Sequence, residues 1–160
     1  PGAKVLDLFA GSGGMGIEAL SRGAESAVFV ERDREAVRII KSNLEATRLT
    51  QRARVMAEDC QTAVSALCEP FDFIFMDAAK GQYLNFLPWI MEVLTCGGVL
   101  VTDNILHEGD ILESRYGVTR RDRTIHGRMR EYLQALKDMP ELDTICLPLG
   151  DGLTISTKMC

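Results

Sequence analysis

The 160-residue sequence contains no apolar run that approaches the roughly 18 residues of a membrane-spanning helix. It also lacks the charged and then apolar leader of a secreted protein, because Pro1–Lys4 runs directly into an apolar segment. These two absences predict a cytoplasmic protein that does not associate with membranes.

The sequence has few residues suited to a zinc site. Its five cysteines are widely spaced and include no Cys-x-x-Cys pair, and it has only two histidines. Neither a zinc site nor a disulfide framework is therefore expected, and the cysteines are interpreted as reduced thiols.

The charge is acidic overall and basic in one place. The formal net charge of −5 argues against indiscriminate binding of nucleic acid. However, the stretch Arg115–Arg130 contains six arginines and one acid, a charge of +5, which leaves −10 for the remainder. Two interpretations of this stretch remain open, a patch that contacts substrate phosphates and a solvated helix face with its loop.

Short apolar runs alternate with longer amphipathic segments, which predicts one α/β domain over residues 1–160 without repeats or linkers. The predicted strands are Val5–Phe9, Ala27–Glu31, Arg54–Ala57, Phe71–Met76, Val99–Thr102, Leu142–Leu147 and Leu153–Thr157. The predicted helices are Gly14–Ser21, Arg34–Thr47, Gln61–Leu67, Tyr83–Leu94 and Arg120–Lys137.

The last two predicted strands are separated only by residues 148–152, which is too short for a parallel crossover. They therefore form an antiparallel hairpin. The expected fold is a doubly wound, mostly parallel seven-stranded sheet in an α/β/α sandwich, ended by this hairpin. That arrangement is typical of Rossmann-like class I methyltransferases and not of dehydrogenases.

A glycine-rich turn follows the first predicted strand. Gly11, Gly13 and Gly16 fit the spacing GxGxxG between a strand and a helix, where a backbone can approach a nucleotide. Glu31 lies 20 residues beyond Gly11 and ends the second strand, where a carboxylate can bind ribose hydroxyls. NAD and S-adenosylmethionine both fit these features, and Asp7, just before the glycines, favours the ammonium group of S-adenosylmethionine.

Asp59 ends the third predicted strand. Its position allows two interpretations, contact with the adenine ring of the cofactor and capping of the following helix.

The run Val5–Gly13 matches the first motif of Rossmann-type methyltransferases. The longer stretch Val5–Leu67 resembles the bacterial 16S rRNA guanine-N2 methyltransferases. Those enzymes carry Asn/Asp-Pro-Pro-Tyr after the fourth strand, whereas this chain has Asp77-Ala78-Ala79-Lys80. The amine-methylating motif is thus absent, and the guanine substrate is not carried over.

Oxygen ligands follow the fourth and fifth predicted strands. Asp77 ends one strand, Asp103 and Asn104 end the next, and the carboxyl ends of parallel strands meet at one edge of a sheet. Two carboxylates and an amide oxygen suit Mg²⁺, or Mn²⁺ in its place. Asp77 would also lie beside the cofactor, and Lys80 could act as general base towards a substrate hydroxyl bound to the metal.

Three runs of the second half resemble the metal-dependent O-methyltransferases of the catechol and caffeoyl-CoA type, most closely the bacterial tRNA 5-hydroxyuridine methyltransferases. They are Phe73–Gly81, Val101–Asn104 and Thr119–His126. The resemblance assigns the same metal-binding and catalytic roles to Asp77, Asp103, Asn104 and Lys80.

The resemblance implies a hydroxylated tRNA base as the first substrate and a catechol-like small molecule as the second. The two resemblances meet between residues 59 and 71, which suggests a chimera of related half-domains or a shortened chain. A cofactor-binding domain without useful turnover is the alternative function, rRNA guanine-N2 methylation is a less favoured one, and a homodimer is one expected assembly.

Overall fold

The structure is a computed structural model, and it describes residues 1–78, 81–105 and 123–160. Its elements are β1 (Lys4–Leu8), α1 (Gly14–Ser21), β2 (Ser26–Val30), α2 (Arg34–Ala46), the 3-10 turn η1 (Thr50–Arg52), β3 (Ala53–Met56), α3 (Cys60–Ala66), β4 (Phe71–Met76), α4 (Tyr83–Val93), β5 (Leu94–Thr102), α5 (Arg123–Asp138), β6 (Leu142–Leu147) and β7 (Leu153–Lys158).

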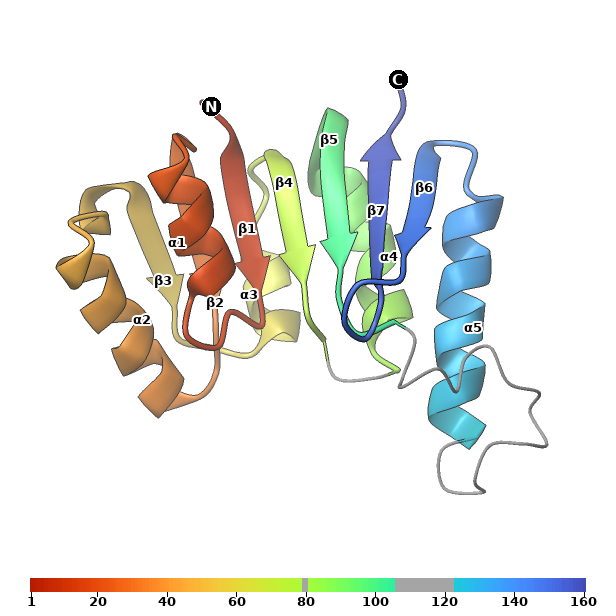
Figure 1. The fold of residues 1–160 in the computed structure, drawn as a ribbon, viewed down its shortest axis with the longest axis horizontal. Helices are drawn as coiled ribbons and strands as arrows, with labels where there is room; N and C mark the ends of the chain where they lie inside the picture. The colour runs from red at the N-terminus through yellow and green to blue at the C-terminus, as the bar shows by residue number, and fades with distance from the viewer. Residues whose placement is uncertain (79–80, 106–122) are drawn as a thin grey trace.

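The strands form one seven-stranded sheet in the order β3-β2-β1-β4-β5-β7-β6 (Figure 1). The first five are parallel to one another, and β7 inserts antiparallel between β5 and β6. The predicted fold class is therefore confirmed, including the antiparallel hairpin at the C-terminal end of the sheet.

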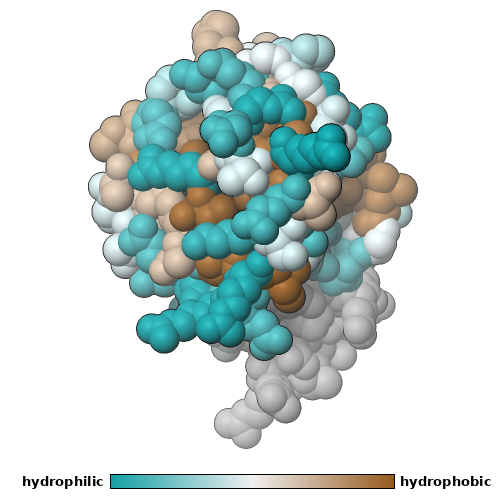
Figure 2. Space-filling view, turned by 90° about the vertical axis from the view of Figure 1, so that its left-hand side faces the viewer, coloured by the Kyte–Doolittle hydropathy of each residue, from teal (hydrophilic) through white to brown (hydrophobic). Residues whose placement is uncertain are grey.

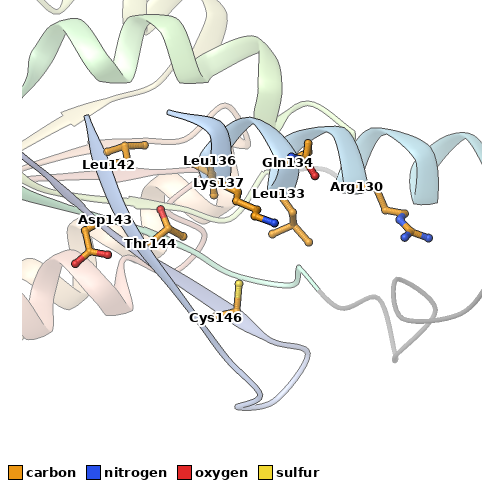
Figure 3. A pocket seen from close by; sticks show the side chains of 9 residues that line it. All are labelled: Arg130, Leu133, Gln134, Leu136, Lys137, Leu142, Asp143, Thr144 and Cys146. Atoms are coloured by element: carbon orange, nitrogen blue, oxygen red, sulfur yellow. The ribbon is translucent and has the colours of Figure 1, made fainter. Parts of the chain in front are cut away.

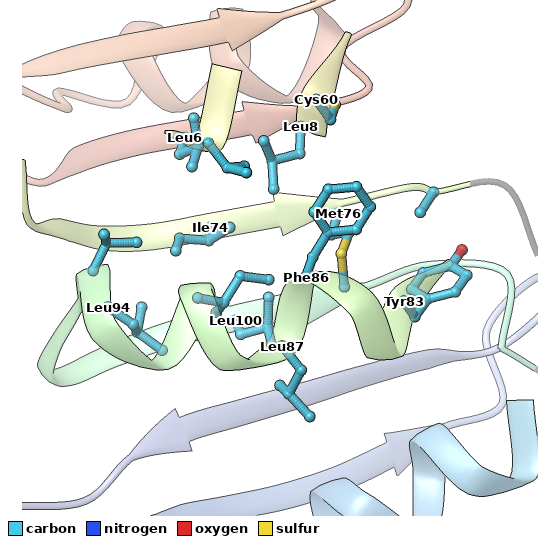
Figure 4. Close-up of a cluster of buried hydrophobic side chains, with 14 of the residues drawn as sticks. Leu6, Leu8, Cys60, Ile74, Met76, Tyr83, Phe86, Leu87, Leu94 and Leu100 are labelled. Atoms are coloured by element: carbon cyan, nitrogen blue, oxygen red, sulfur yellow. The ribbon is translucent and has the colours of Figure 1, made fainter. Parts of the chain in front are cut away.

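The two faces of the sheet carry separate apolar cores. On one face Val5 and Phe29 pack with Leu20 of α1 and Ile40 of α2. The larger core on the other face, shown in part in Figure 4, joins alternate strand residues to α3, α4 and α5. Because successive side chains of a strand point to opposite faces, strands that are apolar throughout supply both cores.

Strand β5 is longer than the sequence predicted. It begins at Leu94 instead of Val99, and the preceding helix ends at Val93. The pairing with β4 shifts between the rung Phe71–Leu94 and the rung Phe73–Val99, so the intervening residues form a bulge. Gly97 has φ of 77°, a backbone conformation that such an irregularity favours. The two adjacent glycines, Gly97 and Gly98, resemble a turn, which is why the sequence did not predict a strand there.

The structure corrects the prediction that all five cysteines are free thiols. Cys96 and Cys160 form a disulfide, with Cα atoms 5.4 Å apart, whereas Cys60, Cys68 and Cys146 are free. The antiparallel pairing of β7 with β5 brings these two cysteines together across 64 residues of sequence. Spacing along the chain contains no sign of such a contact.

Polar side chains cover much of the end of the molecule formed by α2 and β3, with apolar patches between them (Figure 2). Within the parts of the chain that the structure describes, no helix combines the length and apolar character needed to cross a membrane.

Helix α1 lies close to β2 because Gly16 has no side chain. A Cβ atom at Gly16 would overlap the ring of Phe29, which is fully buried, whereas a Cβ at Gly14 would have Ser12 Oγ as its nearest neighbour at 4.0 Å. The third glycine of the turn is therefore required for packing of the helix on the strand.

We expect Gly16→Ala to lower the free energy of unfolding by about 1–3 kcal/mol, because the ring of Phe29 must shift within a packed core. Gly14→Ala, the matched control two residues earlier, should leave stability unchanged or raise it by up to about 1 kcal/mol. Urea denaturation measures both variants, and equal midpoints would contradict the packing role of Gly16.

Candidate functional site

The pairing register aligns the carboxyl ends of five strands. Leu8 pairs with Val30 and Met76, Val30 pairs with Met56, and Met76 pairs with Thr102. The residue after each member of this row begins the loop at that edge of the sheet. Those residues are Phe9, Glu31, Ala57, Asp77 and Asp103.

The glycine-rich turn after β1 is built from left-handed backbone. Phe9, Gly11 and Gly13 have φ of 62°, 54° and 81°, and Gly13 is the N-cap of α1. The amide of Gly11 donates a hydrogen bond of 2.9 Å to Glu31 Oε2. The predicted partners, the glycine turn and the acid that ends the second strand, are thus in direct contact.

Glu31 also fixes the loop after β2, because its other oxygen, Oε1, accepts a hydrogen bond of 2.8 Å from the amide of Asp33. Each carboxylate oxygen can accept more than one hydrogen bond, so this arrangement orients Glu31 and leaves acceptor capacity for ribose hydroxyls.

Asp7 lies beneath the turn and is only 2% exposed. Its Oδ2 accepts a hydrogen bond of 2.9 Å from the amide of Gly16, in the first turn of α1. Burial raises the pKa of Asp7 from 3.8 to about 7, against the lowering effect of that hydrogen bond. The negative charges of Asp77 and Glu31 raise this pKa further. Direct contact with the ammonium group of a cofactor stays a prediction.

A cavity of about 330 Å³ opens between the ends of β1 and β2 and the first turns of α3 and α4. Its lining residues are Phe9, Val30, Glu31, Arg32, Asp59, Cys60, Gln61, Gln82 and Phe86. The rings of Phe9 and Phe86 meet edge to face with centroids 5.5 Å apart. Burial raises the pKa of Cys60 to about 12, so its thiol is neutral at physiological pH. The cavity thus combines an apolar wall with a polar rim.

Asp59 caps a helix, as one of the two interpretations predicted, and its contact with an adenine ring stays a prediction. It is the N-cap of α3, where Oδ1 accepts the amide of Thr62 at 3.1 Å, and these hydrogen bonds lower its pKa. Asp59 also lines the cavity beside Glu31. Capping therefore fixes the residue without removing it from a cofactor's reach.

The acids at the ends of β4 and β5 are neighbours. Asn104 Nδ2 donates to Asp77 Oδ1 at 2.7 Å, and the amide of Asn104 donates to Asp103 Oδ1 at 2.6 Å. The structure thus brings together the three residues predicted to bind a metal.

The donor set fits Mg²⁺, which prefers hard oxygen ligands and retains several waters. Asn104 faces Asp77 with its Nδ2 in this structure, and a cation between the two side chains would require the amide to turn so that its oxygen becomes a ligand. Among the described residues, no three His, Cys, Asp or Glu side chains form a group able to hold a metal ion, so a cation at this position would also need the amide oxygen of Asn104.

Several predicted residues lie outside the described parts of the chain. They include Lys80, the predicted base, and the part of the basic stretch before Arg123. Within the described part, Arg128 Nη1 donates to the carbonyl of Gly81 at 3.3 Å, which ties α5 to the segment before α4.

The sequence analysis missed two residues near the acids. Tyr83, the first residue of α4, is fully buried, and its hydroxyl donates to the carbonyl of Asp103 at 2.9 Å. Asp151, between β6 and β7, is close enough for its charge to raise the pKa of Tyr83. Neither contact was accessible from sequence, because each depends on how separate elements pack.

A larger cavity of about 540 Å³ lies between α5 and β6 (Figure 3). It is lined by Arg130, Leu133, Gln134, Leu136, Lys137, Leu142, Asp143, Thr144 and Cys146. None of the strand-end residues described above lines it. Cavity size alone therefore does not identify the candidate site, which we assign to the convergent strand ends.

The fold and the strand-end site define the class I methyltransferase architecture. An O-methyltransferase from Bacillus cereus, solved in complex with SAH, has a TM-score of 0.83 and 23% identity, over 98% of this chain and 74% of that chain. The chain belongs to the family described as Conserved hypothetical protein 95, whose model matches residues 1–108.

Two curated relatives represent the two resemblances. YlbH of Bacillus subtilis, provisionally named as an rRNA methyltransferase, is 49% identical over 95 residues, 57% of this chain and 52% of YlbH. The caffeoyl-CoA O-methyltransferase of Citrus natsudaidai is 32% identical over 90 residues, 56% of this chain and 39% of that protein. The chain therefore spans about half or less of the length of these relatives.

The raised pKa of Asp7 predicts a pH-dependent stability. Between pH 4 and pH 7 the carboxyl ionises in the unfolded chain and stays protonated in the folded one, so its contribution is present at low pH and lost as pH rises. Asp7→Asn, which mimics the neutral form, should match wild type near pH 4. Near pH 8 it should be more stable by up to about 4 kcal/mol.

Urea denaturation at the two pH values measures this difference, with Asp143→Asn as an exposed-carboxylate control on β6. Equal stability of Asp7→Asn and wild type near pH 8 would show that Asp7 ionises freely in the folded protein.

Proposed function

We propose that the protein is a cytoplasmic, S-adenosylmethionine-dependent O-methyltransferase that uses Mg²⁺ to methylate a hydroxyl group. The observation that carries the proposal is the pair of hydrogen bonds that join Asn104 to Asp77 and Asp103, at the edge of the sheet where a cavity of about 330 Å³ also opens. The cofactor supplies the methyl group, and the paired acids supply a site for a hydroxyl oxygen and a cation.

The cavity supports S-adenosylmethionine as the cofactor. Its rim holds Glu31 for ribose hydroxyls, while Phe9 and Phe86 offer an apolar surface for a purine. The buried carboxyl of Asp7 gains a favourable partner if a cationic amino group lies above the turn, because an opposite charge offsets the cost of its burial.

The donor set supports hydroxyl chemistry. When bound, Mg²⁺ would lower the pKa of a coordinated hydroxyl and fix its oxygen. Asp77 and Asp103 would offset the charge of such a cation, and Asn104 would supply a neutral oxygen once its amide turned. Lys80, three residues after Asp77, is the proposed base for the hydroxyl proton, so proton removal and orientation fall to neighbouring residues of the chain.

We favour a hydroxylated tRNA base as substrate and place a catechol-like small molecule second. Arg128 and Arg130, both exposed, continue the basic stretch onto α5 and could contact phosphates. The likeness to YlbH favours an RNA substrate as well. Guanine N-methylation stays the weaker candidate, since Asp77-Ala78-Ala79-Lys80 replaces the Pro-Pro-Tyr motif.

A domain that binds the cofactor without turnover is the competing proposal, and a chimera of the two related half-domains would favour it. Displacement of a site by about an ångström lowers transfer rates steeply, whereas cofactor affinity depends mainly on the β1–β3 side of the sheet. Binding and turnover therefore need separate measurements.

The cofactor assignment predicts that Glu31→Ala weakens SAH binding by about ten- to hundredfold, the effect of losing hydrogen bonds to a charged group. Glu35→Ala, an exposed acid in the first turn of α2, is the matched control and should leave the affinity unchanged. Calorimetric titration measures both. Undiminished SAH affinity in Glu31→Ala would remove Glu31 from the cofactor site, and tight binding of NAD would overturn the methyltransferase assignment.

The cation assignment predicts that Asp103→Ala abolishes Mg²⁺-dependent methyl transfer while SAH affinity stays within about twofold of wild type. Asp138→Ala, an exposed acid at the end of α5, should transfer as wild type does. The assay follows the labelled methyl group with unmodified tRNA, hydroxylated tRNA or a catechol as acceptor. Full wild-type activity in excess chelator would refute the requirement for Mg²⁺. The acceptor that is methylated fastest shows which of the proposed substrates the protein prefers.

A further inference from the structure

The turn after β5 carries two of the three proposed cation ligands in a constrained backbone. Asn104 has φ of 59°, a left-handed conformation that side-chain-bearing residues rarely adopt and that asparagine tolerates better than most. Asp103 and Asn104 can share one cation with Asp77 only while this turn keeps its shape.

Among the described residues, three hydrogen bonds from other elements hold the backbone of this turn, in addition to the bond within the turn from the Asn104 amide to Asp103 Oδ1. The amide of Asp103 donates to the carbonyl of Met76 on β4 at 3.2 Å, and the amide of Ile105 donates to the carbonyl of Gly152 at 3.2 Å. The third bond, 2.9 Å from the hydroxyl of Tyr83 to the carbonyl of Asp103, is the one that a side chain supplies.

The hydroxyl of Tyr83 has a fixed environment. Its ring is fully buried and packs against Tyr132 of α5, with ring centroids 5.3 Å apart (Tyr83 is labelled in Figure 4). A phenol is protonated at neutral pH, so the Tyr83 hydroxyl acts as the donor in this bond. It binds the carbonyl of Asp103 and leaves the carboxylate available.

We propose that Tyr83 is a positioning residue that holds Asp103 and Asn104 in the cation-binding conformation through the carbonyl of Asp103. This inference rests on the proposed function. It adds Tyr83 to the residues to which that function assigns a role. Since Tyr83 begins α4, the same hydroxyl also couples the position of that helix to the proposed cation site.

Tyr132 offers a matched control. It is also fully buried in the same core, and its hydroxyl shares a hydrogen bond of 2.6 Å with Thr102 Oγ1. Tyr83→Phe and Tyr132→Phe each remove one buried hydroxyl and keep the ring, so both variants lose a comparable hydrogen bond. The hydroxyl of Tyr83 binds the backbone of the turn, whereas the hydroxyl of Tyr132 binds a side chain of β5.

The test titrates wild type and both variants with Mn²⁺, followed by the electron paramagnetic resonance signal of the free ion, with SAH present to stabilise the folded state. Tyr83→Phe should weaken Mn²⁺ binding about three- to tenfold, the effect of one neutral hydrogen bond, with SAH affinity within about twofold of wild type. Tyr132→Phe should lower the melting temperature and keep wild-type Mn²⁺ affinity.

Hydrogen exchange of the Ile105 amide gives a second readout that requires no metal. Exchange should accelerate in Tyr83→Phe and not in Tyr132→Phe, because only the first variant loosens the turn. Equal Mn²⁺ affinity in Tyr83→Phe and wild type, or equal weakening in both variants, would overturn the proposal. If wild type retains no Mn²⁺, the proposed cation site fails, and the Ile105 exchange still decides whether Tyr83 holds the turn.

Discussion

The parallel register of the central strands is the constraint on which the site depends. Because Leu8, Val30, Met56, Met76 and Thr102 occupy one row across the sheet, every loop at that edge starts at the same level. The glycine turn, the cofactor-side acids and the proposed cation ligands therefore lie along one line. A shift of one residue in any strand would also turn that strand's side chains to the opposite face, so the two cores fix the site indirectly.

Acidic groups gather at this edge, and each is stabilised differently. Glu31 is bound by two backbone amides, Asp59 caps a helix, and Asp7 is buried with a pKa near neutrality. Asp77 and Asp103 both contact Asn104. A site with this much negative charge is suited to ligands that carry positive charge, which an ammonium group and a divalent cation both do.

Much of this could be predicted from sequence where local rules apply. The glycine spacing placed Gly11 opposite Glu31, and strand-end acids at Asp77 and Asp103 converge because parallel strands end at the same edge. Contacts between distant elements could not be predicted. Three features depend on how distant elements pack, which residue spacing along the chain does not predict. They are the hydrogen bond of the Tyr83 hydroxyl, the irregular start of β5 and the Cys96–Cys160 disulfide.

The insertion of β7 between β5 and β6 has a consequence for how the protein forms during translation. Strand β5 borders the proposed cation site. Among the described residues, one of its edges pairs with β7, which the ribosome produces about fifty residues later. Until then β5 exposes unpaired backbone groups, the kind of edge that recruits other chains. Until β7 is made, the nascent chain therefore carries an open sheet edge beside the proposed cation site, where another copy of the chain could pair.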